Sequence, residues 1–302
     1  MNDVYESRAV QEAAIMARQD PVVYGNGQYA KALDADSLES YDRNGFIVIE
    51  DLLSAEEVEM LLNEVHRLSE EGARENWKEA IREPDSDLVR SVFSVHRLSS
   101  VFDRLARDPR LLNVARQILG SEVYIHQSRV NYKPGFHGKE FYWHSDFETW
   151  HVEDGMPAMR AISCSVLLTD NTSANGPLML IPGSHRQFVA CPGLTPENHY
   201  EQSLRRQEYG VPDPVSLKML ADMGGIHQVV AKAGSVVFFD CNTMHGSASN
   251  ITPWPRANVF MVYNSVHNML VEPLHGLKPR PEYIAARQHV QALTERSEPQ
   301  LA

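Results

Sequence analysis

Cysteine is scarce in this chain of 302 residues: Cys164, Cys191 and Cys241 are widely spaced and form no CxxC pair. An odd and sparse set of thiols excludes a disulfide framework and is typical of a reducing compartment. Cys241 precedes His245 by four residues, a spacing that a Cys/His metal pair also shows. A small, buried, apolar thiol is the simpler interpretation of each cysteine.

Long apolar runs and an excess of basic residues are also missing. No segment approaches the length of a membrane span, and the polar N-terminus MNDVYESRAVQEAAIMARQD lacks the apolar centre of a signal peptide. Lys and Arg number 28 against 40 Asp and Glu, which gives a net charge of −12. Phosphate binding needs a basic surface. We therefore expect a cytoplasmic protein that binds neither nucleic acid nor membranes.

The chain has ample material for a core, since 43% of its residues are hydrophobic. We interpret it as a single domain, residues 1–302, without internal repeats. Its parts are an N-terminal arm at 1–35, a mainly helical front at 36–121, a β-rich core at 122–270 with an insertion at 186–225, and a C-terminal tail at 271–302.

Two helices are expected in the front part. The first follows Ser54 and Glu57, which have the spacing of a capping box, and carries an apolar stripe up to a predicted stop at Gly72. The second is DPRLLNVARQILG at 108–120, which begins with an Asp cap and a proline and ends at glycine. We assign no chemistry to either helix.

Strand-like runs dominate the rest of the chain, separated by Gly, Pro, Asn and Asp turn signals. They begin at about residue 122 and lie at 122–133, 141–147, 161–169, 178–185, 228–240 and 258–266, while one short apolar strand, 46–50, precedes the first helix of the front part. This pattern predicts a mainly β protein with flanking α-helices, built on a sandwich or jelly roll. The long charged insertion between strands is more often functional or mobile than not.

Alternation along the run 122–133 divides its side chains between two faces. Gln127, Arg129, Asn131 and Lys133 share one face, and Tyr124, His126, Ser128, Val130 and Tyr132 share the other. The polar row is either a solvent face or the lining of a ligand cavity, and the strand alone does not decide between them.

A metal site is indicated by FYWHSDFETWHVEDG at 141–155 together with residues about a hundred positions later. His144 and Asp146 are two apart and project to one side of a strand, while Arg256 follows His245 by eleven residues. Two imidazoles and one carboxylate hold Fe(II) and leave three positions, two for a chelating 2-oxo acid and one for O2. Arg256 offers a planar donor for the distal carboxylate of such an acid. His151 has no spacing that gives it a role.

Two alternatives use similar ligands. A zinc hydrolase would not need Arg256 and would want a general base, for which Glu148 is the one obvious candidate in this stretch. A cupin-like protein would bind a metal without turnover.

These residues resemble a known family. The order His144-x-Asp146, His245 and Arg256 is similar to that of the non-haem Fe(II), 2-oxoglutarate-dependent dioxygenases, and ESYDRNGFIVIEDLLSAEEVEMLL is similar to the start of their phytanoyl-CoA dioxygenase branch. Within this branch, FYWHSDFETWHVEDGMPAMRAISCSVLLTDNTSANGPLMLIPGSH resembles the signature of the ectoine hydroxylases. The resemblance covers about residues 35–285.

The resemblance implies a double-stranded β-helix, the cupin-like jelly roll of this superfamily, with iron held by His144, Asp146 and His245. Fe(II) is then the cofactor, and 2-oxoglutarate and O2 are cosubstrates. The residues assigned to 2-oxoglutarate are Arg256, Asn131, Ser165 and Ser247. The family's tendency also implies a homodimer. A carboxylate at Asp146 favours hydroxylation, since related halogenases carry a small residue there.

The implied substrate is ectoine, a small zwitterion with a carboxylate and a delocalised amidinium cation, which is hydroxylated to 5-hydroxyectoine. On the polar row, Arg129 suits the carboxylate and Gln127 a ring N–H. Trp150, Phe239 and Phe260 are expected to enclose the ring, because aromatic faces attract cations. For Phe239 and Phe260 the competing interpretation is ordinary strand core. Another small amino or imino acid, or an acyl-CoA, is the alternative substrate.

Overall fold

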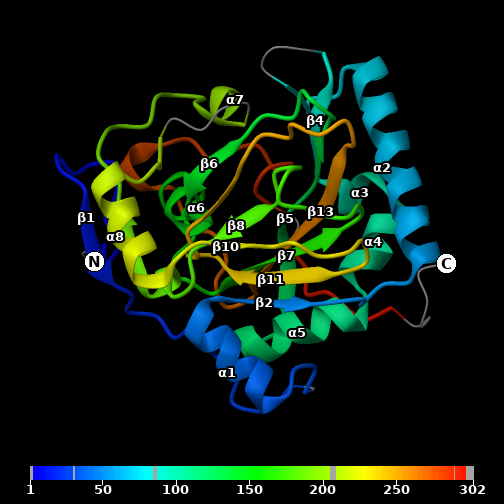
Figure 1. Ribbon diagram of the computed structural model, residues 1–302. Coiled ribbons are helices and arrows are strands. Elements are labelled where there is room, and N and C mark those ends of the chain that lie inside the picture. The colour runs from blue at the N-terminus through cyan, green and yellow to red at the C-terminus, as the bar shows by residue number, and fades with distance from the viewer. Residues whose placement is uncertain (1–2, 30, 84–86, 205–208, 289, 297–302) are drawn as a thin grey trace.

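The computed structural model describes residues 3–29, 31–83, 87–204, 209–288 and 290–296, and its centre is a pair of facing antiparallel sheets (Figure 1). The large sheet has the order β2 (Phe46–Ile49), β11 (Val236–Asp240), β7 (Ala161–Leu167), β13 (Arg256–Ser265), β5 (Val123–Lys133), β4 (Val89–Phe93) and β3 (Ala80–Arg82). The smaller sheet has the order β10 (His227–Gln228), β8 (Leu178–Leu180), β12 (His245–Ser247) and β6 (Phe141–His144). The predicted jelly-roll core with flanking helices is confirmed.

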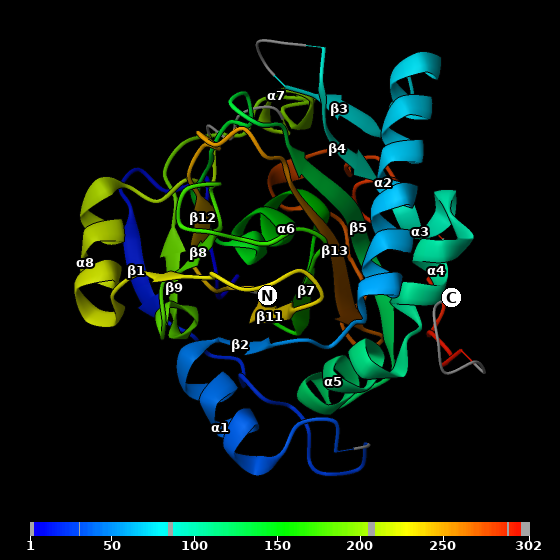
Figure 2. The same ribbon diagram turned by 45° about the vertical axis from the view of Figure 1, so that its right-hand side comes forward.

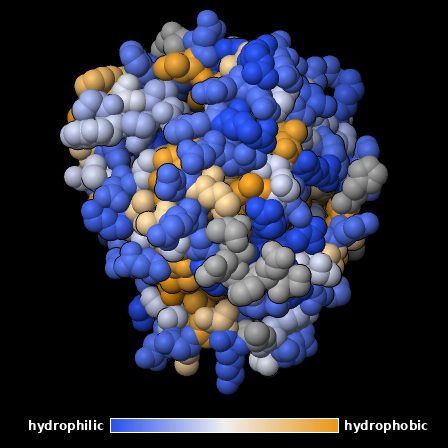
Figure 3. Space-filling model, turned by 90° about the vertical axis from the view of Figure 1, so that its right-hand side faces the viewer, coloured by the Kyte–Doolittle hydropathy of each residue, from blue (hydrophilic) through white to orange (hydrophobic). Residues whose placement is uncertain are grey.

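Helices cover the outer face of the large sheet (Figure 2). They are α2 (Ala55–Glu75), α3 (Val95–Leu98), α4 (Ser100–Ala106) and α5 (Pro109–Leu119), while α1 (Ala35–Asn44) leads into β2. The main apolar cluster lies between these helices and the sheet, and alternate residues of β13 such as Val259 and Tyr263 point into it. The helical side of the molecule is mostly hydrophilic on its surface, with scattered apolar patches (Figure 3). In the described part of the chain, no helix has the length and apolarity needed to cross a membrane.

The insertion and the N-terminal arm are joined by a small sheet. β1 (Ala14–Ala17) of the arm pairs antiparallel with β9 (Gln187–Ala190), the first element of the insertion. Two helices follow in the insertion, α7 (Tyr200–Ser203) and α8 (Pro214–Gly224). Hence two segments about 170 residues apart in sequence meet beside the smaller sheet.

Helix α2 begins as predicted but ends later. The Ser54 side chain accepts from the Glu57 backbone N–H, and the Glu57 carboxylate accepts from the Ser54 N–H, so the capping box is formed. The predicted stop at Gly72 is wrong, since the helix continues to Glu75 and Asn76 takes the left-handed conformation. Gly72 instead lets strand β3 approach closely, because a Cβ there would lie 3.0 Å from the Cβ of Ala80.

Replacing Ser54 by alanine is expected to lower the free energy of unfolding by about 1 kcal/mol, because the backbone N–H groups of the first turn lose their acceptor. Urea denaturation monitored by circular dichroism measures the change. Ser54→Thr keeps the hydroxyl and should retain most of the stability. Equal losses in both variants would contradict the role of the cap.

The predicted division of side chains between the two faces of β5 is correct from Gln127 to Lys133 and wrong for the residues before Gln127. β13 pairs Val262 with Gln127 and the next residue, Tyr263, with Ile125, so β5 carries an extra residue at His126. This bulge reverses the alternation. His126 therefore contacts Trp150 on the site side, with ring centroids 5.0 Å apart, instead of facing the helices with Val130.

Candidate functional site

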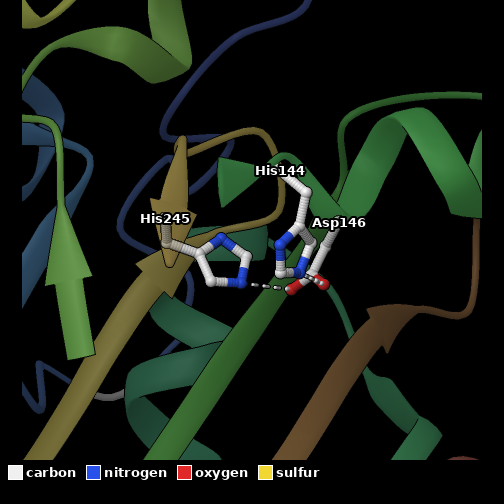
Figure 4. A group of neighbouring side chains, drawn as sticks. All are labelled: His144, Asp146 and His245. Atoms are coloured by element: carbon white, nitrogen blue, oxygen red, sulfur yellow. Dashed lines mark ion pairs between the residues drawn. The ribbon is translucent and has the colours of Figure 1, made fainter. Parts of the chain in front are cut away.

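Three side chains converge between the two sheets (Figure 4). His144 ends β6 and lies opposite His245, which begins β12. Asp146 is the first residue of α6 (Asp146–Asp154), so the expectation that His144 and Asp146 share one strand is wrong, although both reach the same point. The possible ligand atoms of the three residues all lie within 4.8 Å of one another.

Backbone carbonyls fix both imidazole rings. His144 Nδ1 lies 2.7 Å from the Tyr142 carbonyl, and His245 Nδ1 lies 2.9 Å from the Thr243 carbonyl. Since Nδ1 donates in each case, each Nε2 keeps a free lone pair. The Nε2 atoms face the Asp146 carboxylate at 3.7 and 3.9 Å. Outer hydrogen bonds of this kind orient metal-binding histidines.

The protonation states also suit a metal. Burial lowers the pKa of His144 to about 3, and the neighbouring His245 contributes, so the His144 ring is neutral. Burial alone would raise the pKa of Asp146, but the two imidazoles and Arg129 hold it below its ordinary value. The Ser163 hydroxyl donates to the Asp146 carboxylate at 3.2 Å. Two imidazoles and one carboxylate, oriented in this way, fit Fe(II).

Two cavities meet at the three ligands. We call them the Arg256 cavity, which His245 lines, and the Trp150 cavity, which Asp146 lines. His144 lines both cavities, as do Arg129, Asn131 and Phe141. A metal at this point would therefore be open to a different small molecule from each side.

The Arg256 cavity carries a concentration of positive charge. Arg256 is buried and its Nη1 donates to the Gly176 carbonyl at 2.7 Å, while its Nε has no hydrogen-bond partner among the described residues. Burial, with help from Arg90, lowers the pKa of Arg256 to about 10, so the group stays cationic at neutral pH. Ser247 lines the cavity and accepts from Lys133 Nζ at 2.8 Å. A dicarboxylic acid suits such surroundings.

The remaining residues predicted for a 2-oxo acid are placed differently. Asn131 lines both cavities, and its Oδ1 accepts from the Ser91 hydroxyl at 2.7 Å. Ser165 lies outside the lining of both cavities, where its Oγ accepts from Asn258 Nδ2 at 3.1 Å.

The Trp150 cavity is lined by a linked pair from the polar row of β5. Arg129 Nη1 donates to Gln127 Oε1 at 2.6 Å, and Gln127 Nε2 donates to the Ile284 carbonyl of the tail at 2.8 Å. Arg129 is buried, which lowers its pKa, but the nearby Asp146 charge opposes this shift. Trp150 lines the same cavity. Gln127, Arg129 and Asn131 of the polar row thus line a cavity, and the row, including the buried Lys133, is not a solvent face.

The two phenylalanines differ in position. Phe260 lines the Arg256 cavity, and the Arg129 guanidinium lies 5.0 Å from the centre of its ring. Phe239 packs against His245, with ring centroids 4.9 Å apart, and lines neither cavity. His151 lies away from the ligands and bonds to the Met156 carbonyl and to Asp3.

Several lining residues were not singled out in the sequence. Lys133 lies outside the lining of both cavities but donates to Ser247 of the Arg256 cavity, and its alternation with Arg129 and Asn131 was an available signal. The lining residues have no such pattern, because they come from separate segments: Phe93, Thr149, Glu153, Leu204, Tyr209 and Arg280. Their approach to the cavity depends on the folding of the insertion and the tail.

Comparison with known proteins agrees with this chemistry. Residues 41–258 match the family described as phytanoyl-CoA dioxygenase (PhyH). The chain is 67% identical over 291 residues to a protein named ectoine dioxygenase from Bordetella parapertussis, and the match covers 96% of this chain and 94% of that protein.

Solved structures are similar over the whole chain. EctD from S. alaskensis with 2-oxoglutarate and 5-hydroxyectoine has a TM-score of 0.90 at 49% identity, and the match covers 100% of both chains. The same protein with bound Fe has a TM-score of 0.88 at 48% identity, again over 100% of both chains. From the ligand geometry and these matches, the chain belongs to the phytanoyl-CoA dioxygenase family, in which it groups with the ectoine dioxygenases.

Proposed function

We propose that this protein is an Fe(II)- and 2-oxoglutarate-dependent dioxygenase that hydroxylates ectoine to 5-hydroxyectoine and releases succinate and CO2. The observation that carries the proposal is the position of His144, Asp146 and His245 at the junction of two differently equipped cavities. The names of the relatives, and the product bound in the similar EctD structure, supply the identity of the substrate. Such a reaction belongs to compatible-solute biosynthesis under osmotic stress.

The Arg256 cavity takes 2-oxoglutarate in this proposal. When bound, iron supplies the activation of O2 for the oxidation of both substrates. Arg256 binds the distal carboxylate, because its guanidinium is already held by the Gly176 carbonyl and presents further N–H groups to the cavity. Ser247 accepts a hydrogen bond from Lys133, so its own O–H is free to donate to the same carboxylate. Asn131 borders the acid, and Ser165 supports the site through Asn258.

The Trp150 cavity takes ectoine. Arg129 binds the ectoine carboxylate, and its bond to Gln127 fixes the direction of the guanidinium. Gln127 Oε1 keeps one lone pair for a ring N–H, because its amide nitrogen is held by the Ile284 carbonyl. The aromatic face of Trp150 borders the amidinium cation. Phe260 lines the Arg256 cavity and bounds the ectoine site through Arg129, whose guanidinium lies 5.0 Å from its ring, and Phe239 supports Phe260 at a ring distance of 6.5 Å.

Residues of the insertion complete the wall of this cavity. Leu204 and Tyr209 both line it. Their apolar surfaces exclude water from the reacting groups, which protects an oxidising reaction from side reactions.

Succinate release with a panel of substrates tests the proposal. Purified protein with Fe(II), 2-oxoglutarate and O2 is expected to release succinate and 5-hydroxyectoine only when ectoine is added. Proline and acyl-CoA serve as comparison substrates. Turnover that does not depend on ectoine, or faster turnover with a comparison substrate, would contradict the assignment. Hydrolysis of a substrate with zinc in place of iron, without release of succinate, would indicate a hydrolase.

Replacing Arg129 by glutamine is expected to raise the KM for ectoine by about 50-fold, because a hydrogen bond between charged groups is worth about 1.5–3 kcal/mol. The KM for 2-oxoglutarate should change less. Steady-state kinetics with each substrate varied in turn measures both constants. Arg97→Gln removes a half-exposed arginine that pairs with Glu282 at 3.0 Å and serves as the control. Equal KM values for ectoine in the two variants would contradict the role of Arg129.

Compartment, assembly and domain organisation complete the proposal. The three cysteines are free and buried, which suits the reducing conditions of the cytoplasm.

A homodimer is supported by the exposed apolar residues Val215, Met219 and Met223 along one side of α8. Analytical ultracentrifugation distinguishes a dimer from a monomer. The single domain is supported by β2, which the front part contributes to the large sheet. We propose neither a nucleic acid nor a membrane as partner.

A further inference from the structure

An arginine of the N-terminal arm is buried against the helix that begins with Asp146. Arg8 is 1% exposed and precedes the segment that matches the family at 41–258. Its Nη2 lies 2.7 Å from the Glu148 carboxylate, and its Nη1 contacts the Glu153 carboxylate. Both acids belong to α6 and are buried themselves.

The same guanidinium also holds two hydroxyl groups. Nη2 donates to Thr149 Oγ1 at 2.8 Å, and Nη1 donates to Thr195 Oγ1 of the insertion at 3.1 Å. Thr149 and Glu153 line the Trp150 cavity, whereas Arg8 itself does not. Arg8 thus connects the arm and the insertion to the face of α6 that borders the substrate.

The backbone of the insertion packs directly onto this ion pair. At Gly210, which has a φ of +69°, a Cβ would lie 2.3 Å from Arg8 Nη2 and 2.3 Å from Glu148 Oε2. Arg8 and Glu148 therefore form the surface on which this part of the insertion rests. Tyr209, the neighbour of Gly210, lines the Trp150 cavity.

We propose that Arg8 is a positioning residue for the substrate of the Trp150 cavity. Its positive charge balances the charges of the two buried carboxylates, Glu148 and Glu153. Its hydrogen bonds hold Thr149 and Glu153 at the cavity wall. Thr195 and Gly210 of the insertion pack against it beside them. Without Arg8, the nearest remaining cation for Glu153 is Arg280 at 3.8 Å, and an uncompensated buried carboxylate rearranges toward solvent or another cation. The inference rests on the proposed function insofar as ectoine is the occupant of this cavity.

A matched control exists in the same arm. Arg18 is also buried, and its Nη1 pairs with Asp240 at 2.8 Å, but it lines neither cavity. Replacing Arg18 by methionine removes one buried ion pair between the arm and the core, and replacing Arg8 removes two. The two variants differ in whether the lost contacts reach the wall of the Trp150 cavity.

Kinetics give the first readout. Arg8→Met is expected to raise the KM for ectoine by about tenfold or more, with kcat and the KM for 2-oxoglutarate changed less than about threefold. Arg8→Lys should fall between Arg8→Met and the unaltered protein, because a point charge cannot serve four partners at once. Arg18→Met should leave the KM for ectoine unchanged. An unchanged KM in folded Arg8→Met, or an equal rise in Arg18→Met, would overturn the proposal.

Hydrogen exchange gives a readout that does not depend on the identity of the substrate. In Arg8→Met, amides of residues 146–154 and 192–200 should lose protection, and in Arg18→Met they should not. Equal exchange in the two variants would overturn the positioning role even if the unaltered protein hydroxylates ectoine. If the unaltered protein does not turn over ectoine, the proposed function fails, while the exchange data still decide on Arg8. Thr195→Val, which removes only the contact to the insertion, replaces Arg8→Met if that variant does not fold and should expose 192–200 alone.

Discussion

Replacing Asp146 by alanine is expected to abolish ectoine-dependent release of succinate. The carboxylate is the one anionic member of the three ligands, and both His144 and His245 direct Nε2 at it. Loss of an outer partner of a metal ligand costs about 10–100-fold in affinity or activity, so loss of the ligand itself should cost more than about 100-fold. Succinate formation and the iron content of the purified protein measure the two effects.

Ser163→Ala is the matched control for this substitution. It removes only the hydroxyl that donates to the Asp146 carboxylate and leaves the ligand in place. Activity should fall by about 10–100-fold, less than in Asp146→Ala. If Asp146→Ala hydroxylated ectoine at the rate of the unaltered protein, the assignment of the three ligands would be wrong.

The second large effect is expected at Arg256. Arg256→Met should raise the dissociation constant of 2-oxoglutarate by about 100-fold or more, because truncating one partner of a buried charge pair costs about 2–5 kcal/mol. Arg256→Lys should recover little of this loss, since lysine cannot both hold the Gly176 carbonyl and present a planar donor pair. Titration of anaerobic Fe(II) protein with 2-oxoglutarate, followed by its visible charge-transfer band, measures the constant directly.

Arg160→Met serves as the control for Arg256→Met. Arg160 is half-buried and donates through Nε to the Leu119 carbonyl at 3.0 Å, but it borders neither cavity. Its loss should leave the titration unchanged. If Arg256→Met binds 2-oxoglutarate with the same dissociation constant as the unaltered protein, the distal carboxylate of 2-oxoglutarate binds elsewhere and the role of Arg256 is contradicted.

The three candidate iron ligands were predictable from the sequence because each lies at the end or start of a regular element. His245 begins a strand and Arg256 begins another, and the fold brings these two starts to one end of the jelly roll. The spacing of His144 and Asp146 predicted correctly that the two side chains lie close together, but the stated reason, a shared strand, was wrong. The chain turns from β6 into α6 between them, and periodicity cannot reveal a change of element within three residues.

Local departures from regular strand and helix geometry also limited what could be predicted from the sequence. The polar row from Gln127 to Lys133 follows strict alternation and was predicted, whereas His126 was placed on the wrong face because of a single extra residue in β5. Nothing in the sequence marks that bulge. Gly72 is similar, since glycine at the end of an apolar stripe usually stops a helix, but here it allows a close approach of β3.

Contacts between distant segments could not be predicted at all. Arg8 reaches Glu148 across 140 residues, and Arg280 reaches Asp154 across 126. Each of these arginines is an ordinary charge in a polar stretch of sequence. Their partners are determined by the way the arm and the tail fold over α6.

Labelled oxygen tests the central claim most directly. In the proposed reaction the two atoms of O2 are divided between succinate and the hydroxylated product. With ¹⁸O2, mass spectrometry should find one labelled oxygen in 5-hydroxyectoine and one in succinate, with the two products in equal amounts. Unlabelled 5-hydroxyectoine, or succinate formed without it, would contradict the account.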